Sequence, residues 1–389
     1  MNVLFYTLSP RSTVGGAERV RDVLADGLRG RGHTVTTVFT EPRTDLSEVE
    51  DGRWALRLTG ARTWRKVPTP PAVAEATVSL VRLARCLRAV RPDVVNVHYV
   101  DVRAAYFVAL RPFFGYRLVL TAHGSDVLRP FSAVNRAALP HLLRRADAVV
   151  AVTEAVAEGA RSVAPDAAGR VHVVENGVDL GFWSPGPERV AGDAPTVVHV
   201  GRLHGVKGQD VLIEAFRGVL DRHPAARLEL VGDGEERAAL GALAGRLGVA
   251  GSVSFLGELA PEAVRERLRR ASVVALPSRS EGLPLSLLEA FAVGAPAVAT
   301  AVGGVPDAAG DPPACLLVPP EDPGALGDAL GRVLADGALA ADLGERARQR
   351  ARAFSLHRQV ERTEAILHHV VGDGSTPLVS RGLQPAARG

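Results

Sequence analysis

The apolar positions of this chain fall into short runs that alternate with longer amphipathic stretches. The runs at 3–8, 94–98 and 117–122 have the composition of buried strands. Between such runs, stretches such as 17–31 and 71–90 repeat apolar residues at the spacing of an amphipathic helix. Strands that alternate with helices predict a parallel sheet with helices on both faces.

The same rhythm restarts after a segment rich in proline and glycine at 183–195, which we interpret as a linker. Beyond it, apolar runs at 196–200, 227–231 and 273–277 alternate with amphipathic stretches such as 209–222. The pattern therefore predicts a second doubly wound α/β domain. In open sheets of this kind ligands bind beyond the carboxyl ends of the strands, so we expect both sheets to border one cleft.

The pattern divides the chain into four parts. They are an N-terminal Rossmann-like domain over 1–188, a C-terminal Rossmann-like domain over 189–354, a helix over 355–371 and a tail over 372–389. The tail is rich in glycine, serine, proline and arginine, and we expect it to be disordered.

Composition excludes some classes of function. Aromatic residues make up 5% of the chain and the formal net charge is only +3, so we expect no nucleic-acid partner. The first residues have a strand pattern, and the sequence predicts neither a signal peptide nor a membrane-spanning segment. We therefore expect a cytoplasmic protein. Frequent arginine, alanine, glycine and proline indicate a GC-rich bacterial genome, which is compatible with antibiotic or cell-envelope biosynthesis.

Lysine is the rare basic residue of this chain, since Lys66 and Lys207 are the only two among 46 basic residues. Lys207 lies in a basic loop with glycines, 200–208, between an expected strand and an expected helix. Its ammonium group is a compact charge with three donors, which suits a phosphate oxygen in a narrow space. We interpret Lys207, together with Arg202 in the same loop, as a phosphate-binding pair, and Lys66 as a solvated surface residue.

The segment 281–289 carries a second signal. Gly282 and Pro284 open an expected helix, whose first backbone N–H groups would face an anion. Glu281 precedes this helix and Glu289 lies inside it, so the two carboxylates can reach opposite ends of one extended ligand. The structural alternative is a capping glutamate and a hydrogen-bonded glutamate in the core.

These features occur with other short motifs in an order that resembles a known family. The motifs lie at 15–19, 123–126, 175–179, 201–203, 207–208, 231–234, 253–257 and 281–289. Together they are similar to the retaining glycosyltransferases of the GT-B fold, family 4 (glycosyltransferase group 1), over about residues 1–365. The resemblance implies a GT-B fold whose last helix crosses back to the N-terminal domain. It also implies transfer of a hexosyl or N-acetylhexosaminyl group from a nucleotide-diphosphate sugar, with a UDP-sugar favoured.

The resemblance further implies the residues of a donor site. Arg202 and Lys207 would bind the donor diphosphate and neutralise charge that develops on the leaving group. Glu281 would accept hydrogen bonds from the donor sugar, and Glu289 would accept them from the ribose. The remaining donor-site residues would offer backbone groups or close backbone approach: Gly15, Gly16, Gly257, Gly282 and Leu283.

Three further candidates follow expected strands of the N-terminal domain. His123 ends a strand before Gly124, and by resemblance it would contact the donor sugar near its 6-position and orient it for catalysis. Asp126 is a candidate for contact with the acceptor. His98 also ends a strand and is a second candidate for acceptor contact.

The sequence contains no Asp-x-Asp motif of the kind that holds a divalent cation on a diphosphate. Arg202, Lys207 and a helix N-terminus can supply the positive charge instead, so we expect transfer without a metal ion or other cofactor. The resemblance implies that configuration is retained by attack on the same face, with the donor phosphate helping to deprotonate the acceptor hydroxyl.

Two other classes of function share this layout. One is a nucleotide-sugar 2-epimerase of the GT-B fold, and the other is a non-catalytic subunit that binds a nucleotide sugar. The acceptor hydroxyl compound is left open between a sugar, a cyclitol, a natural-product intermediate and a glycolipid. The aromatic stretch Tyr106–Tyr116 is compatible with peripheral membrane contact or with packing on the sheet.

Overall fold

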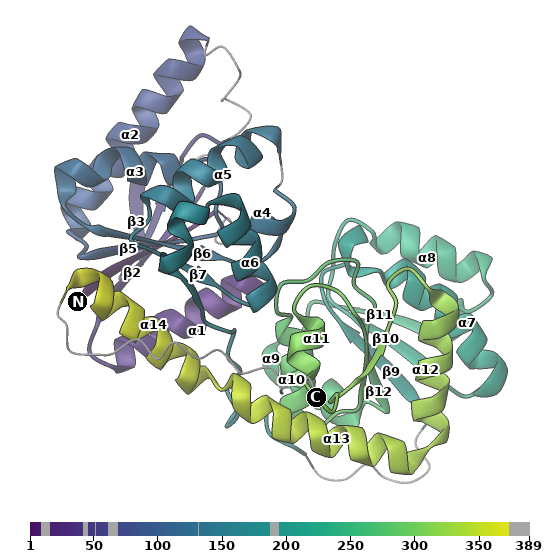
Figure 1. Ribbon diagram of the computed structural model, residues 1–389. Helices are drawn as coiled ribbons and strands as arrows, with labels where there is room; N and C mark the ends of the chain where they lie inside the picture. The colour runs from purple at the N-terminus through teal and green to yellow at the C-terminus, as the bar shows by residue number, and fades with distance from the viewer. Residues whose placement is uncertain are drawn as a thin grey trace. The chain divides into compact units, whose positions relative to one another are not determined.

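A computed structural model describes residues 1–8, 16–41, 46–50, 52–60, 69–130, 132–186 and 194–372 (Figure 1). The chain forms two compact units. Unit 1 comprises residues 1–176 together with the chain from Leu356 onward, and unit 2 comprises Gly177–Ser355. Gly15, Lys66 and the expected tail from residue 373 lie outside the described residues.

Unit 1 is built on an eight-stranded sheet in the order β3-β4-β2-β1-β5-β6-β7-β8. Every neighbouring pair of these described strands is parallel except β3 with β4. The strands are β1 (Asn2–Thr7), β2 (Thr34–Thr40), β3 (Leu46–Glu50), β4 (Arg53–Leu56), β5 (Val94–His98), β6 (Arg117–Ala122), β7 (Ala148–Ala151) and β8 (Val171–Val173).

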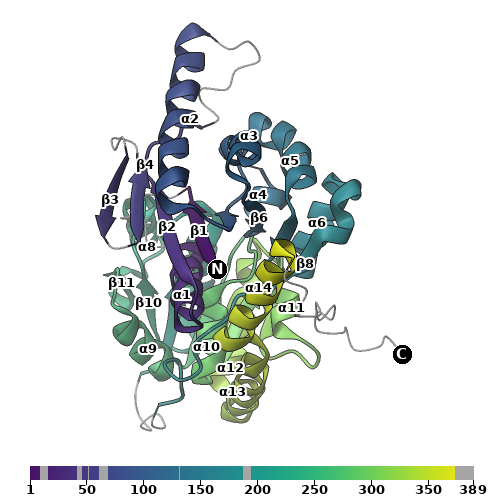
Figure 2. The same cartoon turned by 90° about the vertical axis from the view of Figure 1, so that its left-hand side faces the viewer.

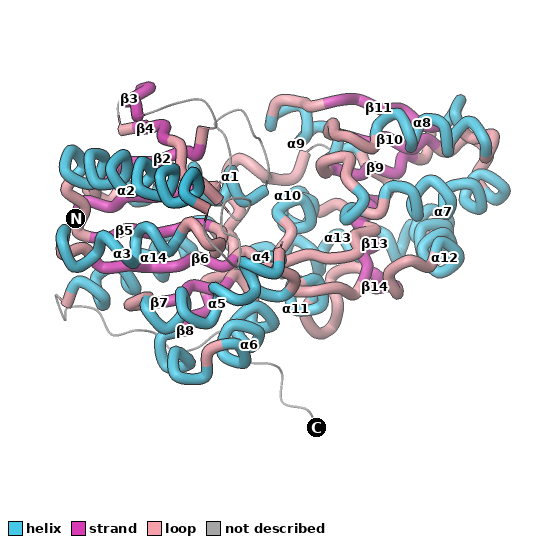
Figure 3. Tube along the Cα trace, turned by 90° about the horizontal axis from the view of Figure 1, so that it is seen from above, coloured by secondary structure: helices cyan, strands magenta, loops and turns pink. Residues whose placement is uncertain are grey.

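Helices flank this sheet, as Figure 3 shows. They are α1 (Gly16–Gly30), α2 (Pro70–Val90), α3 (Ala104–Phe114), α4 (Ser125–Leu128), α5 (Ala133–Arg145), α6 (Glu154–Val163), the 3-10 helix η1 (Pro165–Arg170) and α14 (Leu356–Val371). The last helix lies beside the first (Figures 1 and 2), and a Cβ atom on Gly27 of α1 would lie 2.4 Å from Val360 Cγ2 of α14. Leu24, Leu28 and Leu367 share the core beneath this contact, so α14 is an integral part of unit 1.

Unit 2 is built on a six-stranded parallel sheet in the order β11-β10-β9-β12-β13-β14. The strands are β9 (Thr196–Val200), β10 (Arg227–Val231), β11 (Val253–Gly257), β12 (Val273–Leu276), β13 (Ala297–Thr300) and β14 (Leu316–Val318). Strands β10 and β11 follow β9 on one side of it, and β12 then pairs with β9 on its other side. The loops that follow β9 and β12 therefore meet at a switch point, where α/β sheets bind ligands.

Ten helical segments complete unit 2 among the described residues. They are η2 (Gly205–Lys207), α7 (Gln209–Arg222), α8 (Arg237–Arg246), η3 (Ala250–Ser252), α9 (Pro261–Arg270), α10 (Leu285–Val293), α11 (Val305–Ala309), α12 (Pro323–Ala335), α13 (Gly337–Ala351) and η4 (Arg352–Phe354). Leu212 and Phe216 of α7 pack with Leu228 of β10 and Leu330 of α12 in the core of the unit. The two sheets confirm the prediction of two doubly wound parallel folds.

The boundary between the units differs from the expected one at residue 188, because unit 2 already begins at Gly177. The carbonyl oxygen of Ser184 accepts a hydrogen bond of 2.8 Å from Arg269 Nε, and that of Phe182 accepts one of 3.1 Å from Arg265 Nη1. Both arginines belong to α9. These bonds attach the first part of the expected linker to unit 2.

None of the described helices is both long enough and apolar enough to cross a membrane. The aromatic stretch Tyr106–Tyr116 forms most of α3 and the turn after it. Tyr106, Phe107 and Tyr116 are buried, whereas Phe113 is 80% exposed. Most of these rings therefore pack inside unit 1.

Candidate functional site

The loop after β9 carries Arg202 and Lys207 and is pressed against the loop after β10. Leu203 N donates to Asp233 O over 2.9 Å, and Gly201 N donates to Val231 O over 3.0 Å. A Cβ atom on Gly232, which has a φ of +124°, would lie 2.2 Å from Gly201 O. A glycine is required at this position because any side chain would push the two loops apart.

The far end of the same loop abuts the end of β12. Gly208 has a φ of +68°, and a Cβ atom there would lie 2.1 Å from Pro277 O. Arg279 N donates to Val206 O over 2.8 Å, and Arg279 Nη1 donates to Gly205 O over 2.5 Å. The loop is thus fixed to the segment after β12, and Lys207 is held beside Glu281.

Asp210 at the start of α7 completes this attachment. Its carboxylate accepts bonds of 2.9 and 2.8 Å from Arg279, and hydrogen bonding to this guanidinium lowers the pKa of Asp210. Glu321 accepts from Arg279 Nε over 2.8 Å, and the two carboxylates raise the pKa of Arg279 further. Sequence reasoning missed Arg279, because nothing in the local sequence marks it as a clamp.

Lys207 and Glu281 form an ion pair at the switch point of unit 2. Lys207 Nζ lies 2.7 Å from Glu281 Oε1, and Ser278 Oγ donates to the same oxygen over 2.6 Å. The Glu281 side chain is 7% exposed, while that of Lys207 is 30% exposed. The sequence interpretation gave these residues separate contacts with a ligand, whereas the structure joins them directly.

The backbone of Glu281 is fixed by a third loop. Gly303, after β13, has a φ of +54°, and a Cβ atom there would lie 1.8 Å from Glu281 O. Gly304 N donates to Gly282 O over 2.9 Å. Neither glycine stood out in the sequence, because their importance depends on a loop distant along the chain.

Helix α10 begins at Leu285 with Pro284 as its N-cap, so Gly282 and Leu283 precede it. Leu283 is buried and Gly282 is partly exposed. Glu289 lies in the second turn of α10 and is 4% exposed. Gly257, at the end of β11, has a φ of +70° and its carbonyl oxygen accepts from Gly232 N over 2.8 Å. Gly282 and Leu283 therefore lie in the loop that follows β12, and Gly257 contacts the loop that follows β10.

A buried relay holds the backbone of Arg202. Gln209 Nε2 lies 2.8 Å from Arg202 O and 3.1 Å from His199 Nε2, and His199 Nδ1 lies 2.9 Å from Ala275 O. A carbonyl oxygen only accepts, so Nδ1 carries the proton of a neutral His199 and Nε2 accepts from Gln209. The guanidinium of Arg202 is exposed and makes no hydrogen bond or ion pair within the described part of the chain. The relay fixes the loop while leaving that charge accessible.

In unit 1, His98 and His123 follow neighbouring strands and contact each other. His98 Nδ1 lies 3.1 Å from His123 Nε2. Both residues are buried, His98 with 1% and His123 with 8% of its surface exposed. Burial, and less strongly the nearby Arg21, lowers the pKa of His123 to about 4, and burial lowers that of His98 well below its ordinary value. Both rings are therefore neutral near pH 7, and the contact of His98 with the acceptor stays a prediction.

Asp126 is almost fully buried beside His123, and its contact with the acceptor also stays a prediction. Its carboxylate accepts hydrogen bonds of 2.9 Å from Val100 N, 3.0 Å from His123 N and 2.8 Å from Gly124 N, and the residue is 1% exposed. Burial raises its pKa to about 6, although these hydrogen bonds oppose the change. Asp126 fixes the turn that carries His123.

Gly16 is the first residue of α1. No atom lies within 4 Å of a Cβ added there, which leaves space for a ligand to approach the backbone closely.

Acid is expected to destabilise the protein between about pH 6.5 and pH 4. Burial lowers the pKa of His199 and of His123 from 6.5 to about 4, so in this window the unfolded chain binds protons that the folded chain does not. Stability is then lost as the pH falls. Asp126 acts in the opposite direction below its pKa of about 6 and offsets part of this loss. Melting temperatures measured at intervals from pH 7 to pH 4 should fall; a flat or rising profile would contradict the buried neutral histidines.

The comparisons with known proteins identify the family of the chain. The family profile described as Glycosyltransferase Family 4 matches residues 14–182, and that described as Glycosyl transferases group 1 matches residues 184–350. The D-inositol 3-phosphate glycosyltransferase of Actinosynnema mirum is 33% identical over 294 residues, which cover 69% of this chain and 70% of that protein. The chain spans about half the length of other curated relatives of that name, 50% and 48% in two of them.

Solved structures share the fold at low sequence identity. Sucrose-phosphate synthase from Thermosynechococcus elongatus has a TM-score of 0.81 and 23% identity, over 96% of this chain and 100% of that one. Anabaena Alr3699/HepE in complex with UDP and glucose has a TM-score of 0.77 and 20% identity, over 95% and 100%. These neighbours confirm the predicted GT-B fold. With both family profiles and a relative matched along most of its length, the chain belongs to the glycosyltransferases of group 1, family 4.

Proposed function

We propose that this protein transfers a glycosyl group from a nucleotide-diphosphate sugar to an acceptor hydroxyl, with retention of configuration and without a metal ion. The observation that carries the proposal is the Lys207–Glu281 pair at the switch point of unit 2, beside the exposed Arg202. A diphosphate leaving group gains negative charge as the glycosidic bond breaks, and fixed cations stabilise that charge.

The donor set of this pair suits both halves of a nucleotide sugar. An ammonium has three N–H donors, and Glu281 takes one of them, so Lys207 retains donors for phosphate oxygens. Glu281 uses Oε1 to accept from Lys207 and Ser278, which leaves Oε2 to accept from a sugar hydroxyl. Lys207 would thus bind the diphosphate while it orients the carboxylate that binds the sugar.

The remaining residues would position the donor around this pair. Arg202 would add a second cation to the diphosphate, and Glu289 would accept from the ribose hydroxyls. Backbone groups of Gly257, Gly282 and Leu283 would line the nucleotide. His123, neutral at the pH of an assay, would contribute a hydrogen bond to the sugar rather than a proton.

A UDP-sugar is the favoured donor, because HepE, a neighbour in fold, binds UDP. The names of the relatives point to acceptors that carry a phosphate, such as an inositol phosphate, and we propose these as the first acceptors to examine. The expected place of action is the cytoplasm. Contact with a membrane surface through Phe113 is an additional proposal that rests on the exposure of that ring.

A donor panel tests the proposal directly. Melting temperatures of the protein with UDP-, GDP-, ADP- and TDP-sugars should rise for one nucleotide class, since a ligand that binds the folded state stabilises it. EDTA should leave the rise unchanged if no metal takes part. Absence of a rise with every nucleotide sugar would contradict the donor site.

The reaction products distinguish the three classes of function, a glycosyltransferase, a 2-epimerase and a non-catalytic subunit. With labelled donor and an acceptor panel, the proposal predicts a glycoside of the same anomeric configuration as the donor. Formation of a C2 epimer of the sugar without acceptor would instead identify a 2-epimerase. Binding of the donor with neither product would indicate a non-catalytic subunit.

A further inference from the structure

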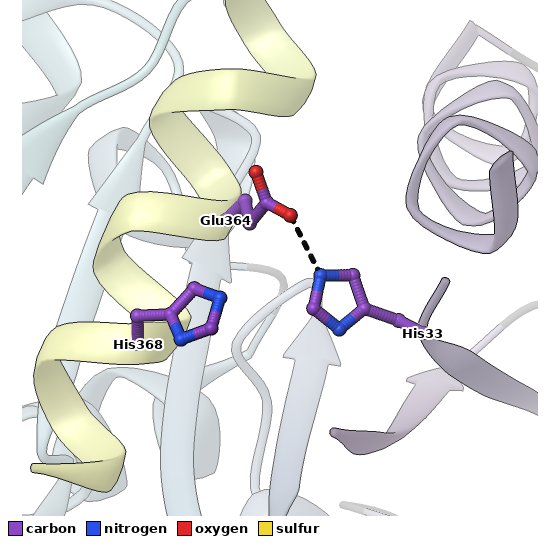
Figure 4. A group of neighbouring side chains, drawn as sticks. All are labelled: His33, Glu364 and His368. Atoms are coloured by element: carbon purple, nitrogen blue, oxygen red, sulfur yellow. Dashed lines mark hydrogen bonds and ion pairs between the residues drawn. The ribbon is translucent and has the colours of Figure 1, made fainter. Parts of the chain in front are cut away.

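His33, Glu364 and His368 form a group of potential metal ligands in unit 1 (Figure 4). Their donor atoms all lie within 4.8 Å of one another; the three residues are partly exposed, although the side chain of His33 is only 7% exposed. Glu364 and His368 are one helical turn apart on α14, which places them on one face of that helix. His33 precedes β2, so two segments far apart in the sequence contribute to the group.

The group is already ordered by its neighbours. His33 Nε2 lies 2.7 Å from Glu364 Oε1, and Arg31 Nε donates to Glu364 Oε2 over 2.7 Å. Burial opposes ionisation of Glu364, but the hydrogen bonds from His33 and Arg31 bring its pKa below the ordinary value. Carboxylates that bind a metal ion are commonly held by a further hydrogen bond, and the bond from Arg31 fixes the position of Glu364 in this way.

Two imidazoles and one carboxylate match the ligands of zinc and related ions, with water as a fourth ligand. In a tetrahedral zinc site the ligand atoms lie about 3.3 Å apart, from metal–ligand distances of about 2.0–2.1 Å. Binding would therefore require rotations of these side chains that close their present spacing of up to 4.8 Å to that value. We propose that His33, Glu364 and His368 bind a divalent transition-metal ion such as Zn²⁺, which fastens α14 to the start of β2.

This site is separate from the proposed chemistry of transfer. His33 precedes β2, whereas His98 and His123 stand at or after the carboxyl ends of β5 and β6, which run parallel to β2 in the same sheet. The metal site therefore lies at the amino ends of the strands, on the opposite side of the sheet from their carboxyl ends. Its role would be structural, and it does not alter the expectation that transfer itself needs no metal.

The surroundings set the expected strength and pH dependence of binding. Arg31, whose Nε lies 2.7 Å from Glu364 Oε2, is a positively charged neighbour that weakens the attraction for a cation. A histidine nitrogen must be unprotonated to bind a metal ion, so binding should tighten as the pH rises. We expect micromolar rather than nanomolar affinity near neutral pH.

Calorimetric titration of the tag-free, EDTA-dialysed full chain with ZnCl₂ tests the site, with melting temperature as a second readout. One ion should bind per chain and raise the melting temperature. His368→Ala should weaken binding at least tenfold, and Glu364→Gln should do the same if the alanine variant folds poorly. His357→Ala is the matched control, because His357 is an exposed histidine of the same helix that pairs with Glu361 over 3.0 Å.

Titration with CoCl₂ gives a spectroscopic test of the same ligands, since a tetrahedral cobalt site absorbs strongly in the visible range. The wild type and His357→Ala should show this absorption, and His368→Ala should lose it. The proposal is overturned if the wild type binds no ion, or if His368→Ala and Glu364→Gln both bind as tightly as the wild type.

Discussion

Replacement of Lys207 by alanine is expected to lower kcat by about 100- to 1000-fold with every donor and acceptor, the usual cost of removing one group that stabilises transition-state charge. The ammonium group would neutralise the departing diphosphate, which is common to all donors. The same change also leaves the carboxylate of Glu281, 7% exposed, with Ser278 as its remaining side-chain partner. Steady-state kinetics with two donors and two acceptors measure the effect.

Val206→Ala is the matched control for this variant. Val206 is the neighbour of Lys207 in the loop and is 41% exposed, so its truncation leaves the backbone bonds to His204 and Arg279 in place. It should retain nearly wild-type turnover. Lys207→Arg keeps the positive charge but replaces the compact ammonium by a planar guanidinium group, so this variant should retain only part of the wild-type activity. If Lys207→Ala retains the wild-type kcat, Lys207 takes no part in the chemistry of transfer.

Gly208→Ala is expected to cause the second largest loss, at least tenfold in kcat/KM, without a direct contact to the ligand. An added Cβ would lie 2.1 Å from Pro277 O, and the backbone at φ +68° disfavours any residue with a side chain. The loop must move away from the end of β12, which separates Lys207 from Glu281. Kinetics and donor affinity measured on the folded variant report this displacement.

The same loop offers a control at Gly205. No atom lies within 4 Å of a Cβ added to Gly205, and its backbone is not in the left-handed region. Gly205→Ala should therefore leave kcat/KM within about twofold of the wild type, since surface substitutions away from special backbone positions have small effects. Equal activity of both alanine variants would mean that the position of this loop does not matter for function.

The repeating strands and helices could be predicted from the sequence because apolar runs and amphipathic stretches are local signals. The pair β3–β4 and the helices α12 and α13 lie in stretches for which we predicted no element. The unit boundary at Gly177 also escaped prediction, since it depends on bonds from Arg265 and Arg269 of a helix distant in the sequence.

The candidate site was predictable where rare residues or glycine patterns mark a loop, as at Lys207 and Glu281. It was not predictable where function depends on contacts between loops. Gly303 matters because its backbone meets Glu281, and His199 matters because it holds Gln209. His98, His123 and Asp126 had the same sequence signal, a polar residue at or after a strand, and this signal did not indicate that all three are buried.

Calorimetric binding of the nucleoside diphosphate selected by the donor panel, in EDTA, tests the central claim most directly. The claim is that Lys207, held beside Glu281, binds the donor diphosphate. Binding to the wild type is predicted to be at least tenfold tighter than binding to Lys207→Ala, while the parent nucleoside without phosphates binds both proteins equally weakly. Equal affinity of the two proteins for the diphosphate would contradict the account.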